Sequence, residues 1–210
     1  LKPIVWVGIL LSVFQQFVGI NVIFYYSTTL WRTVGFEESD ALTITVITSV
    51  TNIAVTILAI LLVDKVGRRP MLLAGSLFMT IALGLMALAF SFAKVSGGEV
   101  TLEAPWAPIA LVAANLFVVA FGATWGPLVW VLLGEMFPNR IRAGALAVAA
   151  AAQWVANFFI STTFPTFSSI SLTFAYGFYA ACALLSLVFV FLRVPETKGK
   201  ELEEMEDLVV

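Results

Sequence analysis

The sequence predicts an all-α, polytopic membrane protein with six membrane-spanning helices. Hydrophobic residues make up 61% of the 210 positions and charged residues only 11%, whereas about a quarter of the residues are charged in soluble domains. Six apolar segments follow one another, and each is long enough to cross the roughly 30 Å hydrocarbon core of a bilayer. They lie in residues 4–30, 42–63, 70–92, 106–134, 144–166 and 172–193. Short connections join them, as a compact bundle requires.

Composition also excludes several classes of function. Histidine is absent and Cys182 is the only cysteine, so neither a histidine-based metal site nor an intrachain disulfide can form. The apolar segments contain no acid pair and no G-x-S-x-G motif, which argues against an intramembrane enzyme. We therefore expect no metal, no cofactor and no nucleic-acid partner. Because Leu1 is not an initiator methionine, we also expect a fragment of a larger protein.

Basic residues predict how the chain is oriented in the membrane. Lysine and arginine accumulate in cytoplasmic loops. Two basic residues, Arg32 and Lys94, fall on one side of the six spans. Nine fall on the other side: Lys2, Lys65, Arg68, Arg69, Arg140, Arg142, Arg193, Lys198 and Lys200. We therefore expect a multi-pass protein of the cytoplasmic membrane with both ends of this segment in the cytoplasm.

The first span carries the amides Gln15, Gln16 and Asn21, followed by Tyr25 and Tyr26. Unpaired polar groups in hydrocarbon cost several kcal/mol each, so these amides need partners. An uncharged amide offers two donors and one acceptor, which suits the hydroxyls of a neutral polyhydroxylated ligand. Amides can also serve only to join membrane helices. For three amides beside two tyrosines we favour the ligand.

We predict that this first span is discontinuous. On a straight helix, Gln16 and Asn21 would point about 140° apart, so they can converge on one ligand only if the helix unwinds. Gly19 is the weak point, because glycine tolerates unusual backbone angles and weakens a helix interior. Discontinuous spans are a known feature of transporter binding sites.

The fourth span should be irregular as well. Pro127 lacks a backbone N–H and predicts a kink, while Gly122 and Gly126 form a small face for close helix packing. Trp130 lies one turn after Gly126, where its indole could stack on the apolar face of a sugar ring. If the six spans form two groups of three, the first span of each group is the irregular one. That pattern favours a 3+3 inverted repeat.

Other spans contribute fewer polar residues. Asn52 stands alone in the second span, where an interhelical hydrogen bond is its simplest role, and Gln153 and Asn157 share a face of the fifth span. Asp64 and Arg68 suggest a charged latch after the second span. The sixth span is apolar and featureless, so we expect it at the periphery. We divide the chain into a bundle over residues 1–194 and a cytoplasmic tail over residues 195–210.

Five motifs resemble, in order and spacing, those of the sugar porter family of the major facilitator superfamily. They are Gln15-Gln16-x-x-Gly19-x-Asn21 with Tyr25-Tyr26, Asp64-Lys65-x-Gly67-Arg68-Arg69, Gly126-Pro127-x-x-Trp130, Glu135-x-x-Pro138-x-x-x-Arg142 and Pro195-Glu196-Thr197-Lys198-Gly199. The match covers the whole chain and is to the C-terminal, six-helix half of a twelve-helix bundle. Residues 125–165 look most like bacterial proton-coupled xylose and glucose porters.

The resemblance implies secondary active transport of a hexose or pentose by alternating access, with proton symport. Its implied partners are a neutral sugar, the lipid bilayer, an N-terminal six-helix half and protons, which would act through a carboxylate of that half. A polyol or inositol transporter, an uncoupled sugar carrier and a transporter-like sugar sensor remain alternatives.

The resemblance also assigns roles to residues. The implied sugar-binding residues are Gln15, Gln16, Asn21, Asn52, Trp130, Gln153, Trp154 and Asn157. The residues implied in gating or helix breaks are Gly19, Tyr25, Tyr26, Gly126 and Pro127. The implied cytoplasmic charge network contains Asp64, Arg68, Arg69, Glu135, Arg142 and Glu196. One departure is Gly122, where many facilitators carry an acid; a glycine there fits the bacterial symporters and removes one candidate sugar contact.

Overall fold

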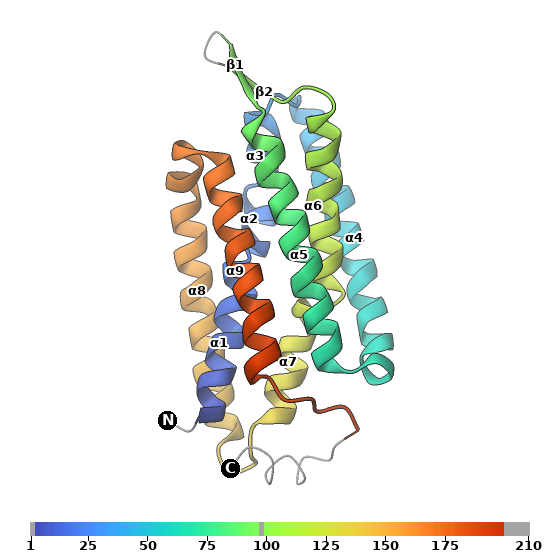
Figure 1. The fold of residues 1–210 in the computed structure, drawn as a ribbon, viewed down its shortest axis with the longest axis vertical. Coiled ribbons are helices and arrows are strands. Elements are labelled where there is room, and N and C mark those ends of the chain that lie inside the picture. Colours follow the sequence, from blue (N-terminus) through green and yellow to red (C-terminus); the bar gives the residue numbers. More distant parts are fainter. Residues whose placement is uncertain (1–2, 97–98, 200–210) are drawn as a thin grey trace.

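The computed structural model describes residues 3–96 and 99–199, and its helices supply six candidate membrane spans, which confirms the predicted number. The first span comprises α1 (Pro3–Phe17) and α2 (Ile20–Tyr25), and α3 (Ser27–Thr33) follows it. Then come α4 (Glu38–Val66), α5 (Arg68–Ser91), α6 (Trp106–Gly122), α7 (Trp125–Met136), α8 (Arg142–Ile170) and α9 (Leu172–Arg193). Figure 1 shows them as an elongated bundle in which α1 begins and α9 ends at the same end.

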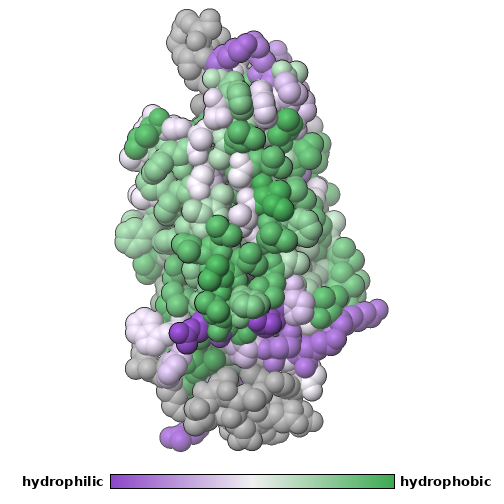
Figure 2. All heavy atoms as spheres, viewed as in Figure 1, coloured by the Kyte–Doolittle hydropathy of each residue, from purple (hydrophilic) through white to green (hydrophobic). Residues whose placement is uncertain are grey.

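The surface of the bundle has the polarity of a membrane protein. Figure 2 shows a broad hydrophobic band between hydrophilic patches near the two ends. Large apolar side chains of α4, α8 and α9 are exposed, among them Ile53, Phe158 and Leu184. Such a surface is stable against lipid or against another helical bundle, because no water contacts it there. The chain is therefore built as a multi-pass membrane protein.

Helix packing is uneven across the bundle. Helix α5 packs most extensively, against α9 and α6, while α1 packs mainly against α8. The spans α4 and α8 are the least buried. The sixth span, α9, was predicted to lie at the periphery, yet it buries more of its surface than either of them. Its small residues Ala175, Ala183 and Ser186 are buried, and Ser186 Oγ lies 2.9 Å from Ser76 Oγ on α5, a contact that the apolar composition alone did not reveal.

Two spans are interrupted. The first breaks between α1 and α2 at Gly19, whose φ of 89° is left-handed, as the sequence predicted. The fourth breaks at Ala123 and Thr124, between α6 and α7. The fourth span is irregular as predicted, but the interruption precedes Pro127 and the proline does not cause it. Pro127 is the third residue of α7, within the first turn, where a backbone N–H has no partner inside the helix.

The connections differ from the prediction at two places. Residues 166–170 were expected to form a loop but continue α8 past Pro165, so that only Ser171 separates α8 from α9. The Ser171 hydroxyl accepts a hydrogen bond from the backbone N–H of Phe174 and begins α9. Between α5 and α6, the expected short connection contains an antiparallel hairpin of β1 (Lys94–Ser96) and β2 (Glu99–Thr101), which was not predicted. Of the predicted tail, residues 200–210 lie outside the described residues.

Candidate functional site

A polar pocket of about 170 Å³ lies between the broken first span and α8. Side chains from two parts of the chain more than 120 residues apart line it. They are Gln16, Asn21, Tyr25, Gln153, Trp154 and Asn157. The structure thus brings together the amides of the first and fifth spans, which the sequence had singled out separately.

Hydrogen bonds connect these amides into one network. Asn21 Nδ2 donates to Gln16 Oε1 and, at 2.9 Å, to Asn157 Oδ1. Gln153 Nε2 donates to Gln15 Oε1. Gln153 Oε1 is buried and has no hydrogen-bond partner among the described residues. The pocket therefore presents both satisfied and free amide groups, the chemistry that exchanges hydrogen bonds with hydroxyls.

The break at Gly19 makes this convergence possible. A straight helix would separate the side chains of Gln16 and Asn21, whereas here they are hydrogen-bonded. The ring of Tyr179 on α9 packs against the break so closely that a Cβ on Gly19 would lie 2.9 Å from its Cδ2 atom. Both the left-handed φ and this contact favour glycine at the position.

Gln15 stands behind the pocket and does not line it. It is 2% exposed, and its Nε2 donates to the carbonyls of Trp125 and Gly126, at 3.1 Å each, in the first turn of α7. Through its Oε1 it also accepts from Gln16 at 3.3 Å and from Gln153. Gln15 thus links the two broken spans and orients the amides of the pocket.

Ser161 belongs to the same network, although the sequence analysis missed it. Its Oγ donates to Asn157 Oδ1 at 3.1 Å, and its carbonyl accepts from Tyr26 Oη at 2.8 Å. Ser161 lies four residues after Asn157, so both side chains share a face of α8. That spacing was the signal that could have identified it.

Besides Gln15, two more expected members of the site, Asn52 and Trp130, lie outside the residues that line the pocket. Asn52 packs α4 against α6: a Cβ on Gly122 would lie 2.8 Å from Asn52 Oδ1 and 2.6 Å from Val55 Cγ2. The glycine that departs from many facilitators therefore allows these two helices to approach closely. Trp130, on α7, is 43% exposed and does not line the pocket.

The pocket is incomplete on its own. Binding pockets for small molecules usually measure about 300–1,000 Å³, well above the roughly 170 Å³ here. The aromatic side chains at its margin, Tyr25 and Trp154, are 60% and 68% exposed. A larger groove between α5 and α9 is lined only by apolar side chains and offers nothing to recognise a polar solute. Among the described residues, no group of three or more His, Cys, Asp or Glu side chains could hold a metal ion.

The charged side chains of Asp64, Arg68, Glu135 and Glu196 cluster near the turn between α4 and α5. We call this end of the bundle the basic end. The buried Arg68 donates from Nη2 to Asp64 at 3.0 Å and to Glu135 at 2.7 Å. After α9, residues 195–199 cross this turn: the Glu196 carboxylate accepts from the backbone N–H groups of Arg68 and Arg69. Thr197 Oγ1 donates to Glu135, and Lys198 Nζ donates to the Lys65 carbonyl. Neither residue was predicted in the charge network.

Two arginines predicted in this network do not join its ion pairs. Arg69 donates from Nη2 to the Phe191 carbonyl at 2.7 Å, and its guanidinium carbon lies 5.4 Å from the centre of the Phe191 ring. Arg142 donates to the Phe137 carbonyl and to Asn139, and in the described part of the chain no ion pair joins it to Glu135. Sequence spacing placed these arginines near acids but could not show where their long side chains turn.

Acidification should release residues 195–199 from the α4–α5 turn. Burial opposes ionisation of Glu196, but hydrogen bonds from backbone N–H groups outweigh it and hold the pKa of this carboxyl below its ordinary value of 4.5. Folding lowers the pKa of Glu196, so the ionised carboxylate stabilises the folded protein at pH values above 4.5. This stabilisation is lost as the pH falls through the lower pKa that Glu196 has in the folded protein. Hydrogen exchange at the Arg68 and Arg69 amides, corrected for intrinsic rates, should show protection at about pH 6 that decreases towards about pH 3.

The Glu196→Ala variant is the control for this experiment. Its Arg68 and Arg69 amides should exchange quickly at both pH values, because the acceptor is gone. Equal protection in the wild type at both values would show that the carboxylate does not hold this segment.

Two interrupted spans that meet beside a buried amide pocket define a polytopic membrane protein of the kind from which secondary transporters are built. The chain belongs to the family described as "Sugar (and other) transporter", whose profile matches residues 2–209. This confirms the sugar porter resemblance and a transporter family instead of an enzyme family.

Individual relatives agree with this assignment. The chain is 58% identical to the glucose transport protein of Synechocystis and 43% identical to the D-xylose-proton symporter of Escherichia coli K12, over 98% of its own length in each case. It is 34% identical to the glucose facilitated diffusion protein of Zymomonas mobilis. It covers only 44%, 41% and 42% of these three proteins, less than half of each.

Solved structures show the same fold. The xylose symporter XylE bound to 6-bromo-6-deoxy-D-glucose, a major facilitator protein, superimposes with a TM-score of 0.86 at 42% identity. The match covers 100% of this chain and 43% of XylE. The six spans therefore have the arrangement of part of a major facilitator bundle.

Proposed function

We propose that this segment is the C-terminal half of a monosaccharide carrier and that the amide pocket supplies part of its sugar site. The observation that carries the proposal is the convergence of Gln16, Asn21 and Asn157 across the break at Gly19. A hydroxyl both donates and accepts, so a sugar can replace the amide–amide hydrogen bonds without leaving a polar group unpaired. The glucose and xylose carriers among the relatives support a hexose or pentose as substrate.

The incomplete pocket explains why a second half is needed. In the proposed carrier, an N-terminal bundle covers the exposed aromatic margin of the pocket, and the two halves rock about the bound sugar. Gly19, Tyr25 and Tyr26, together with Gly126 and Pro127, would mark the segments that move. The basic end would face the cytoplasm, where the ion pairs of Arg68 stabilise the state closed on that side.

We further propose that transport is coupled to protons. The E. coli relative is a symporter, whereas the Z. mobilis relative is named for facilitated diffusion. Within the described spans, Asp and Glu stand only near helix ends, as Asp64 and Glu135 do. An intramembrane ionisable residue usually marks a proton pathway, so the titrating carboxylate would belong to the N-terminal half.

Uptake measurements test this function. The full-length protein would be reconstituted in vesicles and supplied separately with radiolabelled D-glucose, D-xylose and myo-inositol, with and without an inward proton gradient. We expect accumulation of glucose or xylose above the external concentration only when the gradient is present. Equilibration without accumulation would contradict symport but keep the carrier, and uptake of inositol alone would contradict the monosaccharide assignment. Binding without uptake would indicate a sensor.

A further inference from the structure

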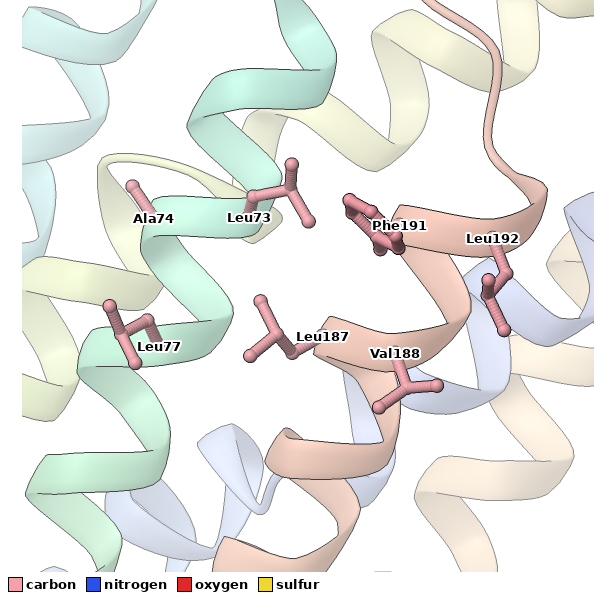
Figure 3. Close-up of a pocket in the computed structure, with 7 residues that line it drawn as sticks. All are labelled: Leu73, Ala74, Leu77, Leu187, Val188, Phe191 and Leu192. Atoms are coloured by element: carbon pink, nitrogen blue, oxygen red, sulfur yellow. The ribbon is translucent and has the colours of Figure 1, made fainter.

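A wholly apolar groove of about 520 Å³ runs between α5 and α9 (Figure 3). Seven side chains line it: Leu73, Ala74, Leu77, Leu187, Val188, Phe191 and Leu192. Leu77, Val188, Phe191 and Leu192 are each between 47% and 65% exposed, so no described element covers the groove. Both helices are long and apolar enough to cross a membrane, so the groove lies within a pair of candidate membrane spans.

One end of the groove carries a cation. Phe191 forms part of the lining, and Arg69 holds its guanidinium 5.4 Å from the centre of that ring. A single hydrogen bond, to the Phe191 carbonyl, fixes the arginine in this position. A guanidinium has five N–H donors, so most of its donors remain available to another acceptor.

No acid neutralises this guanidinium in the described part of the chain. Glu196, the acid nearest in the network, accepts from the backbone N–H of Arg69 and not from its side chain. Asp64 and Glu135 are paired with Arg68. Arg193, the last residue of α9, is exposed, and among residues 3–96 and 99–199 no acid pairs with this second cation at the same end of the helix. Within the described residues, this end of the groove therefore carries two cations that no acid neutralises.

We propose that the groove is a binding site for an anionic phospholipid, with one acyl chain along the groove and the headgroup phosphate on Arg69. The fork of an arginine matches a phosphate with two parallel hydrogen bonds. Basic residues between membrane helices near the surface are the usual feature that recognises anionic headgroups. Leu77 lies eight positions after Arg69 on α5, so the groove continues for about 12 Å below the headgroup position. The inference depends on the membrane location and not on the proposed sugar.

A second apolar groove in the same bundle, without an unpaired cation described beside it, serves as a comparison. It lies between α5 and α6, measures about 380 Å³ and is lined by apolar residues such as Leu85, Val112 and Leu116. Just after the end of α5, Lys94 is paired with Glu103 at 2.9 Å. We expect this second groove to contact acyl chains without selecting a headgroup.

The test uses the full-length protein in vesicles of equal amounts of phosphatidylglycerol and phosphatidylcholine, followed by native mass spectrometry to count the lipids that remain bound. The wild type should retain phosphatidylglycerol in preference to phosphatidylcholine. Arg69→Gln should reduce this preference about fivefold, the factor expected for one basic residue near an anionic headgroup. Arg69→Lys, which keeps the charge but cannot make the two parallel hydrogen bonds, should keep only part of it. Ala74→Phe, which fills the groove, should reduce retention while Arg69 is intact.

Three results would overturn the proposal. The first is an unchanged phosphatidylglycerol preference in Arg69→Gln. The second is an equal loss in Arg32→Gln, an exposed arginine at the other end of the bundle, because that would indicate a diffuse effect of charge. The third is a wild-type dimer that Ala74→Phe converts to a monomer without loss of bound phosphatidylglycerol, because a second copy of the chain would then occupy the groove.

Discussion

Replacing Asn21 with alanine should reduce sugar affinity by about fivefold to a hundredfold and reduce uptake accordingly. Asn21 lines the pocket and donates to both Gln16 and Asn157. Its loss removes one partner of the sugar and leaves Gln16 Oε1 without its donor, while Asn157 Oδ1 keeps only the hydrogen bond from Ser161 Oγ. Each unsatisfied buried polar group costs about 1–3 kcal/mol, which corresponds to that range in affinity.

Asn115→Ala is the matched control for this prediction. Asn115, on α6, is also a half-buried amide, and it bonds to Thr48 on α4 at 3.3 Å and to the Leu111 carbonyl at 2.9 Å. It does not line the polar pocket. Its removal should change sugar affinity less than twofold. Equal losses in both variants would mean that amides in this bundle support helix packing and that the pocket has no special role.

Gly75→Ala should destabilise the protein by about 1–3 kcal/mol, the usual cost of overpacking. A Cβ on Gly75 would lie 1.9 Å from Thr124 Oγ1 and 2.7 Å from Thr124 Cβ. Thr124 stands at the break between α6 and α7 and is itself buried, so it has little room to move. The next residue, Trp125, is tied to α5 by hydrogen bonds from its Nε1 to the Leu72 carbonyl and to Ser76 Oγ.

Gly84→Ala, on the same helix, is the control. A Cβ there meets nothing within 4 Å, so its thermal midpoint in detergent should stay equal or rise slightly, because alanine favours a helix over glycine. The double variant Gly75→Ala/Thr124→Gly should regain part of the lost stability, since the clashing side chain is gone. If Gly75→Ala and Gly84→Ala unfold at the same temperature, the close approach of α5 to the second break does not limit stability.

Hydropathy and the special properties of glycine accounted for most of the fold. Six spans and the break at Gly19 follow from local sequence, because span length and a left-handed φ are local properties. The hairpin at β1 and β2 was missed, since three-residue strands in a polar connection carry almost no periodic signal. Pro127 correctly predicted that the fourth span is irregular, but the interruption lies at Ala123 and Thr124. Proline is also favoured in the first turn of a helix, which is where Pro127 lies.

The candidate site was only partly predictable, because tertiary packing decides which polar residues meet. Gln16, Asn21, Gln153 and Asn157 were selected by residue type and do line one pocket. For Asn52 the residue type predicted an interhelical contact and only the family resemblance implied sugar binding; the structure packs it against Gly122. The periodicity of a helix determines on which face of the helix a side chain lies, but it does not determine which neighbouring helix packs against that face.

The most direct test of the sugar site is an experimental structure of the full-length protein with bound D-glucose. Our account predicts the sugar beside the break at Gly19, with hydroxyls within about 3.2 Å of the Gln16, Asn21 and Asn157 amides and new hydrogen bonds in place of those between the amides. A sugar that contacts none of these three side chains, with their mutual hydrogen bonds unchanged, would contradict it.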